Sequence, residues 1–257
     1  PEICPKMATE CGADQTKGVI EVGPGFGVLT RELAARANKV VAIELDKRLP
    51  AVLAETLRDF DNVKVVQADV MEVDLHQLIQ DEFSGLDVLV CANLPYYITS
   101  PVIMKLLEEK LPVESLTVMV QKEAAVRICA APGTRACGAV SVAVQYYSQP
   151  QILFDVPRDC FFPAPNVDSA VIRLNIRKEP PVKLETEEKQ FFKLVKAAFG
   201  QRRKTVLNSL NTGLGKSKEE LSAALQQAGI APTARAEQLT MEQFGTLCNL
   251  LFPNKTK

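Results

Sequence analysis

A continuous apolar run stops abruptly in residues 86–97, which read Leu-Asp-Val-Leu-Val-Cys-Ala-Asn-Leu-Pro-Tyr-Tyr. A short Val-rich run bounded by turn residues is typical of a central parallel strand, and open α/β sheets bind ligands beyond the carboxyl ends of such strands. We therefore expect Asn93, Leu94, Pro95 and Tyr96 to face a crevice. Proline has a fixed φ and pushes the residue before it toward an extended conformation, so the backbone carbonyls there are held stiffly.

This predicted corner offers groups that suit one kind of substrate. An amide oxygen, rigid carbonyls and an aromatic face together match a flat base that bears an exocyclic amine. The alternative is a plain turn, in which Asn93 and Pro95 only end the strand and Tyr96 packs on the core. These four residues alone favour the plain turn, so the rest of the chain has to decide.

Length and composition set broad limits on the protein. Its 257 residues are enough for one large domain and a smaller one, and a hydrophobic fraction of 47% is that of an ordinary globular protein. No apolar run reaches the length of a membrane span and no basic-then-apolar leader is visible, so we expect a soluble, unprocessed, cytoplasmic protein. The chain begins with Pro1, not Met, so we expect residues upstream to be missing.

Cysteine and histidine usage points away from metal and disulfide chemistry. The seven cysteines include no Cys-x-x-Cys pair, which disfavours a zinc site and a disulfide framework and predicts reduced thiols in a cytosol-like compartment. His76 is the only histidine and lies in a polar stretch that predicts a surface helix. We therefore expect no metal and no imidazole catalysis.

A glycine-rich loop lies between a predicted strand and a predicted helix and reads Glu-Val-Gly-Pro-Gly-Phe-Gly from Glu21 to Gly27. Glycines at 23, 25 and 27 let the backbone approach a ligand closely at a helix N-terminus. The Gly-x-Gly-x-Gly spacing differs from a dinucleotide fingerprint, and Glu21 would repel a pyrophosphate. A cofactor with positive charge is favoured, and S-adenosylmethionine, with its sulfonium and ammonium, fits.

Two further acids follow the next predicted strands. Glu44 ends the strand 39–45, where a carboxylate can accept hydrogen bonds from ribose hydroxyls. Asp69 follows the strand 63–67 and either receives the exocyclic amine of an adenine or simply caps a helix; spacing does not separate these two interpretations. Three acids at three successive strand ends favour a cofactor site more than any one of them does.

The next segments are predicted to alternate between helices and strands. Thr99 or Ser100 is expected to cap a helix, and residues 116–120 and 123–129 are predicted as a strand and a helix. Two more strands, 140–147 and 151–156, flank a Gln-Pro turn and are predicted to form an antiparallel hairpin.

A stiff loop with two prolines, residues 161–169, precedes a last predicted strand at 170–176. Such a loop presents aromatic side chains well. Phe161 or Phe162 would then form the second face of a base sandwich opposite Tyr96. The alternative is that both phenylalanines belong to the core.

A composition break at Lys-Glu-Pro-Pro, residues 178–181, predicts a boundary between a domain 1–177 and a domain 178–257. Helical patterns follow at 186–198, 202–214, 217–228 and 240–252, and Ser217 with Glu220 and Thr240 with Gln243 are predicted to form capping boxes at the starts of the last two. The connection 199–205 carries Arg202, Arg203 and Lys204, which either bind phosphates or only solvate a surface.

Four segments in this order, 21–27, 93–96, 161–169 and 199–205, make the chain resemble the small-subunit (16S-type) ribosomal RNA adenine N6,N6-dimethyltransferases from about residue 1 to 252. This family also resembles the antibiotic-resistance dimethyltransferases of large-subunit RNA. The resemblance implies an α/β fold: a Rossmann-type, S-adenosylmethionine-dependent methyltransferase domain followed by a small all-helical domain that helps dock RNA. It also implies an upstream basic segment with a Gln-Asn-Phe-Leu motif, which nothing in this sequence matches.

The resemblance assigns roles to particular residues. The implied catalytic residues are Asn93, Leu94, Pro95, Tyr96 and Phe161. The implied cofactor-binding residues are Gly23, Glu44, Asp69 and Asn93. The glycine loop and the strand ends add Glu21, Gly25, Gly27 and Leu45 to the predicted cofactor-binding residues. The implied RNA-binding residues are Arg202, Arg203 and Lys204. The implied activity is dimethylation of adjacent adenosines of small-subunit ribosomal RNA, in a pre-ribosomal particle, by a monomer.

The expected mechanism is direct in-line methyl transfer to N6 of adenosine without a general base. The Asn93 side-chain oxygen and the carbonyl of Leu94 or Pro95 would accept hydrogen bonds from the amine. Two alternatives stay open: a target in large-subunit RNA or DNA, and a non-catalytic RNA-binding assembly or transcription factor that keeps an unused pocket.

Overall fold

The computed structural model describes residues 2–253. The chain divides into two compact units. The first unit combines the residues up to Ala125 with Ser148–Ile176, and the second combines Val126–Tyr147 with the residues from Arg177 onward. The sequence predicts a single boundary between a domain 1–177 and a domain 178–257. The structure differs from this prediction, because Val126–Tyr147, from the middle of the chain, belongs to the second unit.

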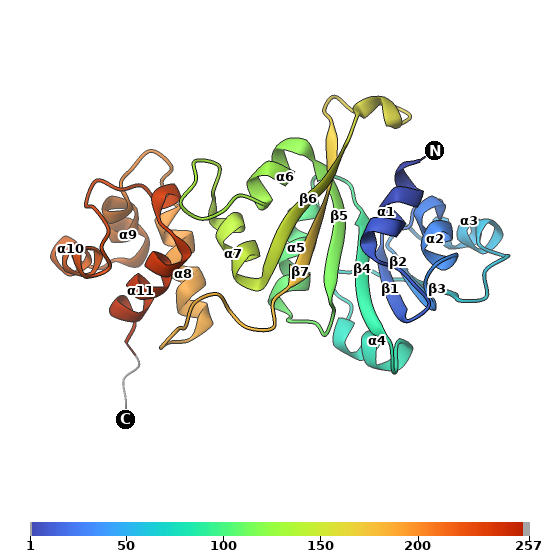
Figure 1. Ribbon diagram of the computed structural model, residues 1–257, viewed down its shortest axis with the longest axis horizontal. Coiled ribbons are helices and arrows are strands. Elements are labelled where there is room, and N and C mark those ends of the chain that lie inside the picture. The colour runs from blue at the N-terminus through green and yellow to red at the C-terminus, as the bar shows by residue number, and fades with distance from the viewer. Residues whose placement is uncertain (1, 254–257) are drawn as a thin grey trace. The chain divides into compact units, whose positions relative to one another are not determined.

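The first unit is built on a seven-stranded sheet with the strand order β3-β2-β1-β4-β5-β7-β6 (Figure 1). Pairing is parallel from β3 to β5, and β7 runs antiparallel to both β5 and β6. The strands are β1 (Lys17–Val22), β2 (Lys39–Glu44), β3 (Val63–Gln67), β4 (Asp87–Asn93), β5 (Ser115–Gln121), β6 (Ser148–Val156) and β7 (Ser169–Ile176). This arrangement confirms the predicted Rossmann-type α/β sheet.

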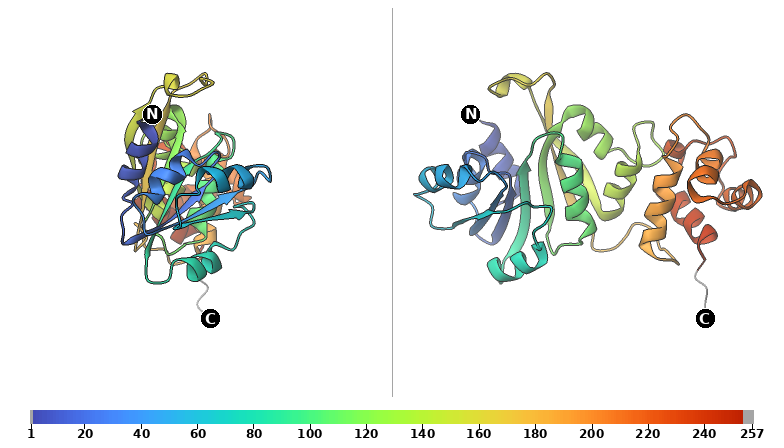
Figure 2. Two further views of the ribbon diagram at one scale, coloured as in Figure 1. Left: turned by 90° about the vertical axis from the view of Figure 1, so that its right-hand side faces the viewer. Right: turned by 180° about the vertical axis from the view of Figure 1, so that it is seen from behind.

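Helices cover both faces of this sheet. Helix α1 lies on the face seen in Figure 1, and α5 lies on the face seen from behind in Figure 2. The helices of this unit are α1 (Ile3–Cys11), α2 (Val28–Ala34), α3 (Leu49–Thr56), α4 (Leu75–Glu82), α5 (Thr99–Glu108) and the start of α6 (Lys122–Ile128).

Strand β4 has the character expected of a central parallel strand. Its five inner residues are buried and only its two ends, Asp87 and Asn93, are exposed. Since both faces of the sheet are covered, the strand has to be apolar at every inner position instead of alternating. The abrupt end of the apolar run at Asn93 therefore marks the edge of the core, as the sequence predicts.

The predicted strand 140–147 is wrong: residues 139–147 form helix α7 (Ala139–Tyr147), and β6 starts only at Ser148. A run that is apolar at nearly every position fits a buried strand and a buried helix equally well, so its periodicity does not decide. Packing decides instead, because Val142 and Tyr146, four residues apart, both enter the core of the second unit. Strand β6 then pairs with β7, not with residues 140–147.

The second unit is helical in the residues that the structure describes. Its helices are α7, α8 (Glu188–Ala198), α9 (Val206–Leu214), α10 (Lys218–Gln227) and α11 (Met241–Leu251). Of the two predicted capping boxes, Thr240 and Gln243 form a complete one, whereas at Ser217 one of the two bonds is present, from Glu220 N to the Ser217 hydroxyl (3.1 Å). These caps satisfy backbone N–H groups that a helix start would otherwise leave unpaired.

Helix α9 starts later than the pattern from Arg202 predicts. Thr205 is its N-cap, and Asn208 N donates to the Thr205 hydroxyl at 3.4 Å. Arg202, Arg203 and Lys204 therefore lie in the connection before the helix, where all three are exposed.

Candidate active site

Neighbouring strands of the first unit end at one edge of the sheet. Val22 of β1 is in register with Ile43 of β2 and with Ala92 of β4. The segments that follow these strands, together with the one after β3, therefore leave the sheet at its carboxyl edge, where open α/β sheets bind ligands. The predicted cofactor and base-binding residues of the first unit follow these strand ends.

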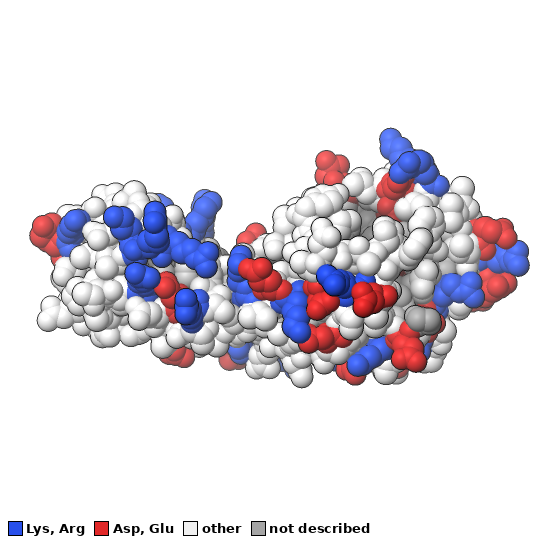
Figure 3. All heavy atoms as spheres, turned by 90° about the horizontal axis from the view of Figure 1, so that it is seen from above, with Lys and Arg blue, Asp and Glu red and all other residues white. Residues whose placement is uncertain are grey.

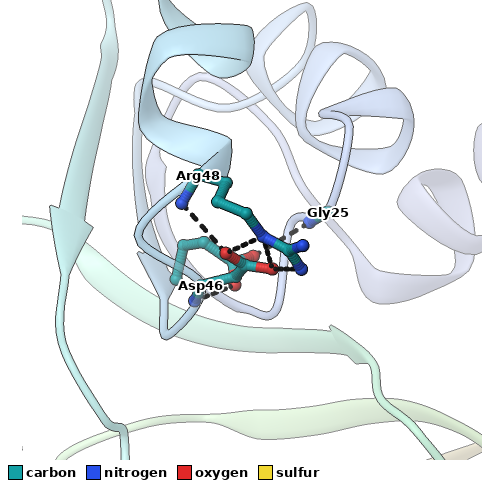
Figure 4. A network of polar contacts seen from close by, with 4 residues as sticks. Gly25, Asp46 and Arg48 are labelled. Atoms are coloured by element: carbon teal, nitrogen blue, oxygen red, sulfur yellow. Dashed lines mark hydrogen bonds and ion pairs between the residues drawn. The ribbon is translucent and has the colours of Figure 1, made fainter.

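The glycine loop after β1 is fastened to the end of β2 by two hydrogen bonds. Gly23 N donates to the Ile43 carbonyl (3.0 Å), and Gly25 N donates to Glu44 Oε2 (3.2 Å; Figure 4). A Cβ added at Gly25 would meet no atom within 4 Å, whereas one at Gly27 would come within 3.1 Å of Leu53. The loop is thus packed where it enters α2 and open at Gly25, where backbone is left uncovered by side chains.

The Glu44 carboxylate is oriented by backbone groups on both of its oxygens. Gly25 N binds Oε2, and Asp46 N donates to Oε1 at 2.8 Å (Figure 4). The side chain is buried, and an ionised carboxylate that accepts one bond on each oxygen still has lone pairs for hydroxyl donors. Leu45, the next residue, is 59% exposed and offers an apolar surface beside this carboxylate.

A salt bridge that the sequence analysis missed fixes the turn after β2. Arg48 Nη2 lies 2.6 Å from Asp46 Oδ2, and Arg48 Nε and N both donate to Asp46 Oδ1 at 2.9 Å (Figure 4). These hydrogen bonds from Arg48 lower the pKa of Asp46 to about 2. The pair holds the turn that presents Asp46 N to Glu44, and its only sequence signal is an Asp-x-Arg spacing before a helix.

Glu21 lies fully inside the first unit, only 1% exposed. Burial, together with the nearby negative charge of Glu44, raises the pKa of Glu21 to about 8, although Thr30 opposes the shift. Its Oε2 atom has no hydrogen-bond partner among residues 2–253. The carboxyl group is therefore mainly protonated at pH 7, so the charge repulsion assumed from the sequence does not apply to this state. With 1% of its surface exposed, the side chain supports the end of β1 from inside the unit.

Asp69 caps a turn, not a helix. Its Oδ1 atom accepts a hydrogen bond from Met71 N (2.8 Å), whereas the N-cap of α4 is Asp74, which accepts from Gln77 N (3.0 Å). The helix-cap interpretation of Asp69 is therefore wrong. Its Oδ2 atom accepts no hydrogen bond in the described part of the chain, which leaves it available to a donor.

The corner after β4 holds its carbonyls in two different states. The Pro95 carbonyl accepts hydrogen bonds from Ile98 N and from the Thr99 hydroxyl, both at 3.1 Å. The Leu94 carbonyl, by contrast, accepts none from residues 2–253. Of the two carbonyls proposed from the sequence, that of Leu94 is thus the one without a hydrogen-bond partner among the described residues.

The corner also contains an exposed amide and a hydroxyl that stiffens its backbone. Asn93 is exposed at the very end of β4. Neither Thr99 nor Ser100 caps the following helix, because the N-cap of α5 is Ile98, which makes no side-chain cap. The Thr99 hydroxyl is used on the Pro95 carbonyl instead, so it stiffens the corner.

Tyr96 joins the corner to the start of β7. Its hydroxyl shares a hydrogen bond with the hydroxyl of buried Ser169 (2.8 Å). The ring is half-buried, so it does not pack wholly in the core as the plain-turn interpretation requires. Ser169 also ends the proline-rich loop, and this contact therefore connects two of the predicted site segments.

Phe161 and Phe162, either of which could stack on the base according to the sequence, occupy different environments. Phe161 is half-buried and packs against a core cluster that includes Val156 and Val171, whereas Phe162 is fully exposed. The base of their loop is closed by Arg158 N, which donates to Asp168 Oδ1 at 3.0 Å.

The two units carry net charges of opposite sign. The second unit contains sixteen Lys and Arg residues against eight Asp and Glu, and the first contains fourteen against twenty-three. Figure 3 shows Lys and Arg gathered on one face of the helical unit. The overall net charge of −1 therefore hides a strongly basic unit, which includes exposed Lys193, Lys196, Arg202, Arg203 and Lys204.

Comparison with known proteins assigns the chain to a family. The model of the family described as ribosomal RNA adenine dimethylase matches residues 2–252. The chain belongs to this family. Its corner, glycine loop and helical unit are therefore features of a ribosomal RNA adenine dimethylase.

Curated and solved proteins resemble this family member along most of its length. Proteins named ribosomal RNA small subunit methyltransferase A are 50% identical over 98% of this chain and 87% of their own in Geobacillus thermodenitrificans, and 54% identical over 89% and 80% in Alkaliphilus metalliredigens. A dimethyladenosine transferase from Plasmodium falciparum is 25% identical with a TM-score of 0.77, covering 96% and 94% of the two chains. The 23S rRNA methyltransferase ErmE is 28% identical with a TM-score of 0.70, covering 97% of each.

Two kinds of feature are not found in the part of this family member that the structure describes. Nowhere in residues 2–253 do three or more His, Cys, Asp or Glu side chains gather as a metal ion would require. In the same part of the chain, no helix has the length and apolar character to cross a membrane.

Proposed function

We propose that this protein transfers methyl groups to N6 of adjacent adenosines in small-subunit ribosomal RNA, giving N6,N6-dimethyladenosine during maturation of the subunit. The observation that carries the proposal is the corner after β4, where the exposed amide of Asn93 precedes a carbonyl, that of Leu94, with no hydrogen bond from residues 2–253. Membership of the adenine dimethylase family supports the same reaction.

The residues that follow β1, β2 and β3 at the carboxyl edge of the sheet fit S-adenosylmethionine, which supplies a methyl group on a positively charged sulfur when bound. Glu44 would accept hydrogen bonds from the ribose hydroxyls, and the open Oδ2 of Asp69 would accept one from the adenine amine. Leu45 would cover an apolar face. The open backbone at Gly25 would receive the amino-acid portion with its ammonium group.

The roles of the corner follow from its hydrogen bonding. As N6 is alkylated, its N–H groups gain positive charge and become stronger donors, so the oxygens of Asn93 and Leu94 bind them more tightly in the transition state than in the ground state. Pro95 acts through its rigid backbone, because its own carbonyl is already satisfied. Tyr96, fixed by Ser169, would present its ring to the base, and Phe161 would cover the opposite face.

Sequence similarity favours small-subunit over large-subunit RNA as the target. The relatives named for the small subunit are 50% and 54% identical to this chain, whereas ErmE, a 23S rRNA methyltransferase, is 28% identical. We place the reaction on a pre-ribosomal particle in the cytoplasm, carried out by a monomer. The basic helical unit, with Arg202, Arg203 and Lys204, supports docking on RNA.

Replacement of Asn93 by Ala tests the proposal. The variant should lose methyl transfer to undermethylated small subunits while its affinity for S-adenosylmethionine changes far less, because the amide acts on the substrate amine. Mass spectrometry of adenosines and calorimetric titration of the cofactor measure the two effects, with naked large-subunit RNA as the competing substrate. Full dimethylation by the variant would remove the role of Asn93, and transfer only to large-subunit RNA would reassign the substrate.

A further inference from the structure

Two aromatic pairs of consecutive residues stand on the two loops that meet at this site. Tyr96 and Tyr97 follow β4, and Phe161 and Phe162 precede β7. In each pair the first ring is half-buried and the second is bare: Tyr97 is 86% exposed and Phe162 is 103% exposed. Tyr96 and Phe161 are assigned to the target base, whereas Tyr97 and Phe162 have no role in that assignment.

Both exposed rings are carried by fixed backbone. Beside Tyr97, the Pro95 carbonyl binds Ile98 N and the Thr99 hydroxyl. Below Phe162, the loop is closed by Arg158 N on Asp168 Oδ1 and by Lys122 N on the Asp168 carbonyl, both at 3.0 Å. Phe161 anchors the same loop on the core.

The two loops belong to one edge of the sheet. Strands β4 and β7 lie on either side of β5, with Asn93 in register with Met119 and Ser169 in register with Gln121. The hydrogen bond between Tyr96 and Ser169 ties the loops together. Tyr97 and Phe162 are therefore exposed rings on two loops that are joined at the edge of the sheet where Asn93 lies.

We infer that Tyr97 and Phe162 form an outer stacking pair that binds the unpaired nucleotide next to the target adenosine; this rests on the proposed function. An adenosine whose N6 reaches the corner has to leave its base stack, and the adjacent base then loses a stacking partner. A bare aromatic ring replaces that partner and accepts any base, since every base has a π-face.

Local charge favours stacking over phosphate contacts for this pair. The loop of Phe162 carries Arg158, but Asp159 lies 3.9 Å from its guanidinium, and Lys122 at the loop base is paired with Asp155 at 2.6 Å. Phosphate binding would need unpaired cations. The contribution of the outer pair should therefore depend little on salt, unlike that of the basic helical unit.

The test measures how variants of the whole protein bind RNA probes in which one base is changed or removed. The probe is a single-stranded RNA oligonucleotide with two adjacent adenosines, in which one adenosine is the methyl acceptor and the other is present, replaced by fluorescent 2-aminopurine, or abasic. Phe162→Leu and Tyr97→Leu keep apolar bulk without an aromatic face, and Phe162→Tyr restores one. Ile152→Ala, at a 40% exposed position on β6, is the matched control.

Stacking on the outer pair should make the double Leu variant bind the intact oligonucleotide about tenfold more weakly or worse, with an unchanged affinity for S-adenosylmethionine. Wild type should quench 2-aminopurine fluorescence, the double variant should not, and Phe162→Tyr and Ile152→Ala should behave as wild type. With the abasic probe, wild type and double variant should bind alike.

Three results would overturn the inference: equal affinities of wild type and double variant for the intact probe, a loss of equal size on the abasic probe, or no quenching by wild type. Failure of the proposed function has a different signature, because wild type would then leave N6 of adenosine unmethylated in RNA whatever the outer pair does.

Discussion

At the scale of single residues, Glu21 makes the stability of the first unit depend on pH. Its buried carboxyl has a pKa of about 8, against 4.5 for the ordinary group. The folded chain therefore keeps a proton that the unfolded chain releases between these values. The stabilising contribution is fully present below pH 4.5 and is lost as the pH rises through 8.

Glu21→Gln puts a permanently neutral amide in the same space. We expect little change in Tm at pH 5 and a higher Tm than wild type at pH 8.5, by roughly 2–4 °C for each kcal/mol regained. Thermal unfolding across this pH range measures the effect. Glu55→Gln, at a largely exposed position, is the control, and parallel Tm profiles for wild type and Glu21→Gln would show that Glu21 does not titrate as described.

The sequence predicts the contacts of single residues less well than it predicts helices and strands. The position of Asn93 at a strand end follows from the apolar run before it. That the Pro95 carbonyl is already bonded to Thr99, or that burial keeps Glu21 protonated, depends on groups brought together only by folding. The Asp46–Arg48 pair likewise has a weak local signal, although it sets the geometry around Glu44.

At the scale of elements, one side-chain hydrogen bond joins the loop after β4 to the start of β7. Tyr96→Phe and Ser169→Ala each remove one partner, and each should cost about 1 kcal/mol of unfolding free energy, more where a buried hydroxyl stays unpaired. The double variant should lose less than the sum of the two. A denaturant double-mutant cycle measures this coupling, and strict additivity would mean that the bond contributes nothing.

Elements with a clear pattern were predicted well, and those without one were not. The strand 63–67 has the predicted bounds, and the caps of α10 and α11 lie at the predicted Ser217 and Thr240. Residues 140–147 are predicted as a strand but lie in helix α7, because an uninterrupted apolar run has no periodicity that separates the two. Their helical state is set by the partners of Val142 and Tyr146 in the second unit, which the local sequence does not contain.

At the scale of the whole molecule, the separation of charge predicts distinct roles for salt. Arg202→Gln, Arg203→Gln and Lys204→Gln together should weaken RNA binding and lower the slope of log affinity against log salt by up to about 3, with no effect on cofactor affinity. Filter binding over a salt series measures the slope.

Replacement of Lys183, Lys189 and Lys218 by Gln is the matched control, since it removes the same charge from other exposed positions of the second unit. Equal slopes for the two triple variants would mean that net charge alone, and not the connection before α9, binds RNA.

The discontinuous second unit constrains how this chain is made on the ribosome. Helix α7 packs through Tyr146 against Phe191 of α8, with ring centroids 5.1 Å apart, and the Tyr147 hydroxyl donates to Glu188 at 2.6 Å. These partners are translated some forty residues after α7, so the nascent helix emerges without them. The sheet of the first unit is likewise incomplete until β7, which lies between β5 and β6, has been synthesised. The first unit therefore becomes complete only after Val126–Tyr147 of the second unit has been made.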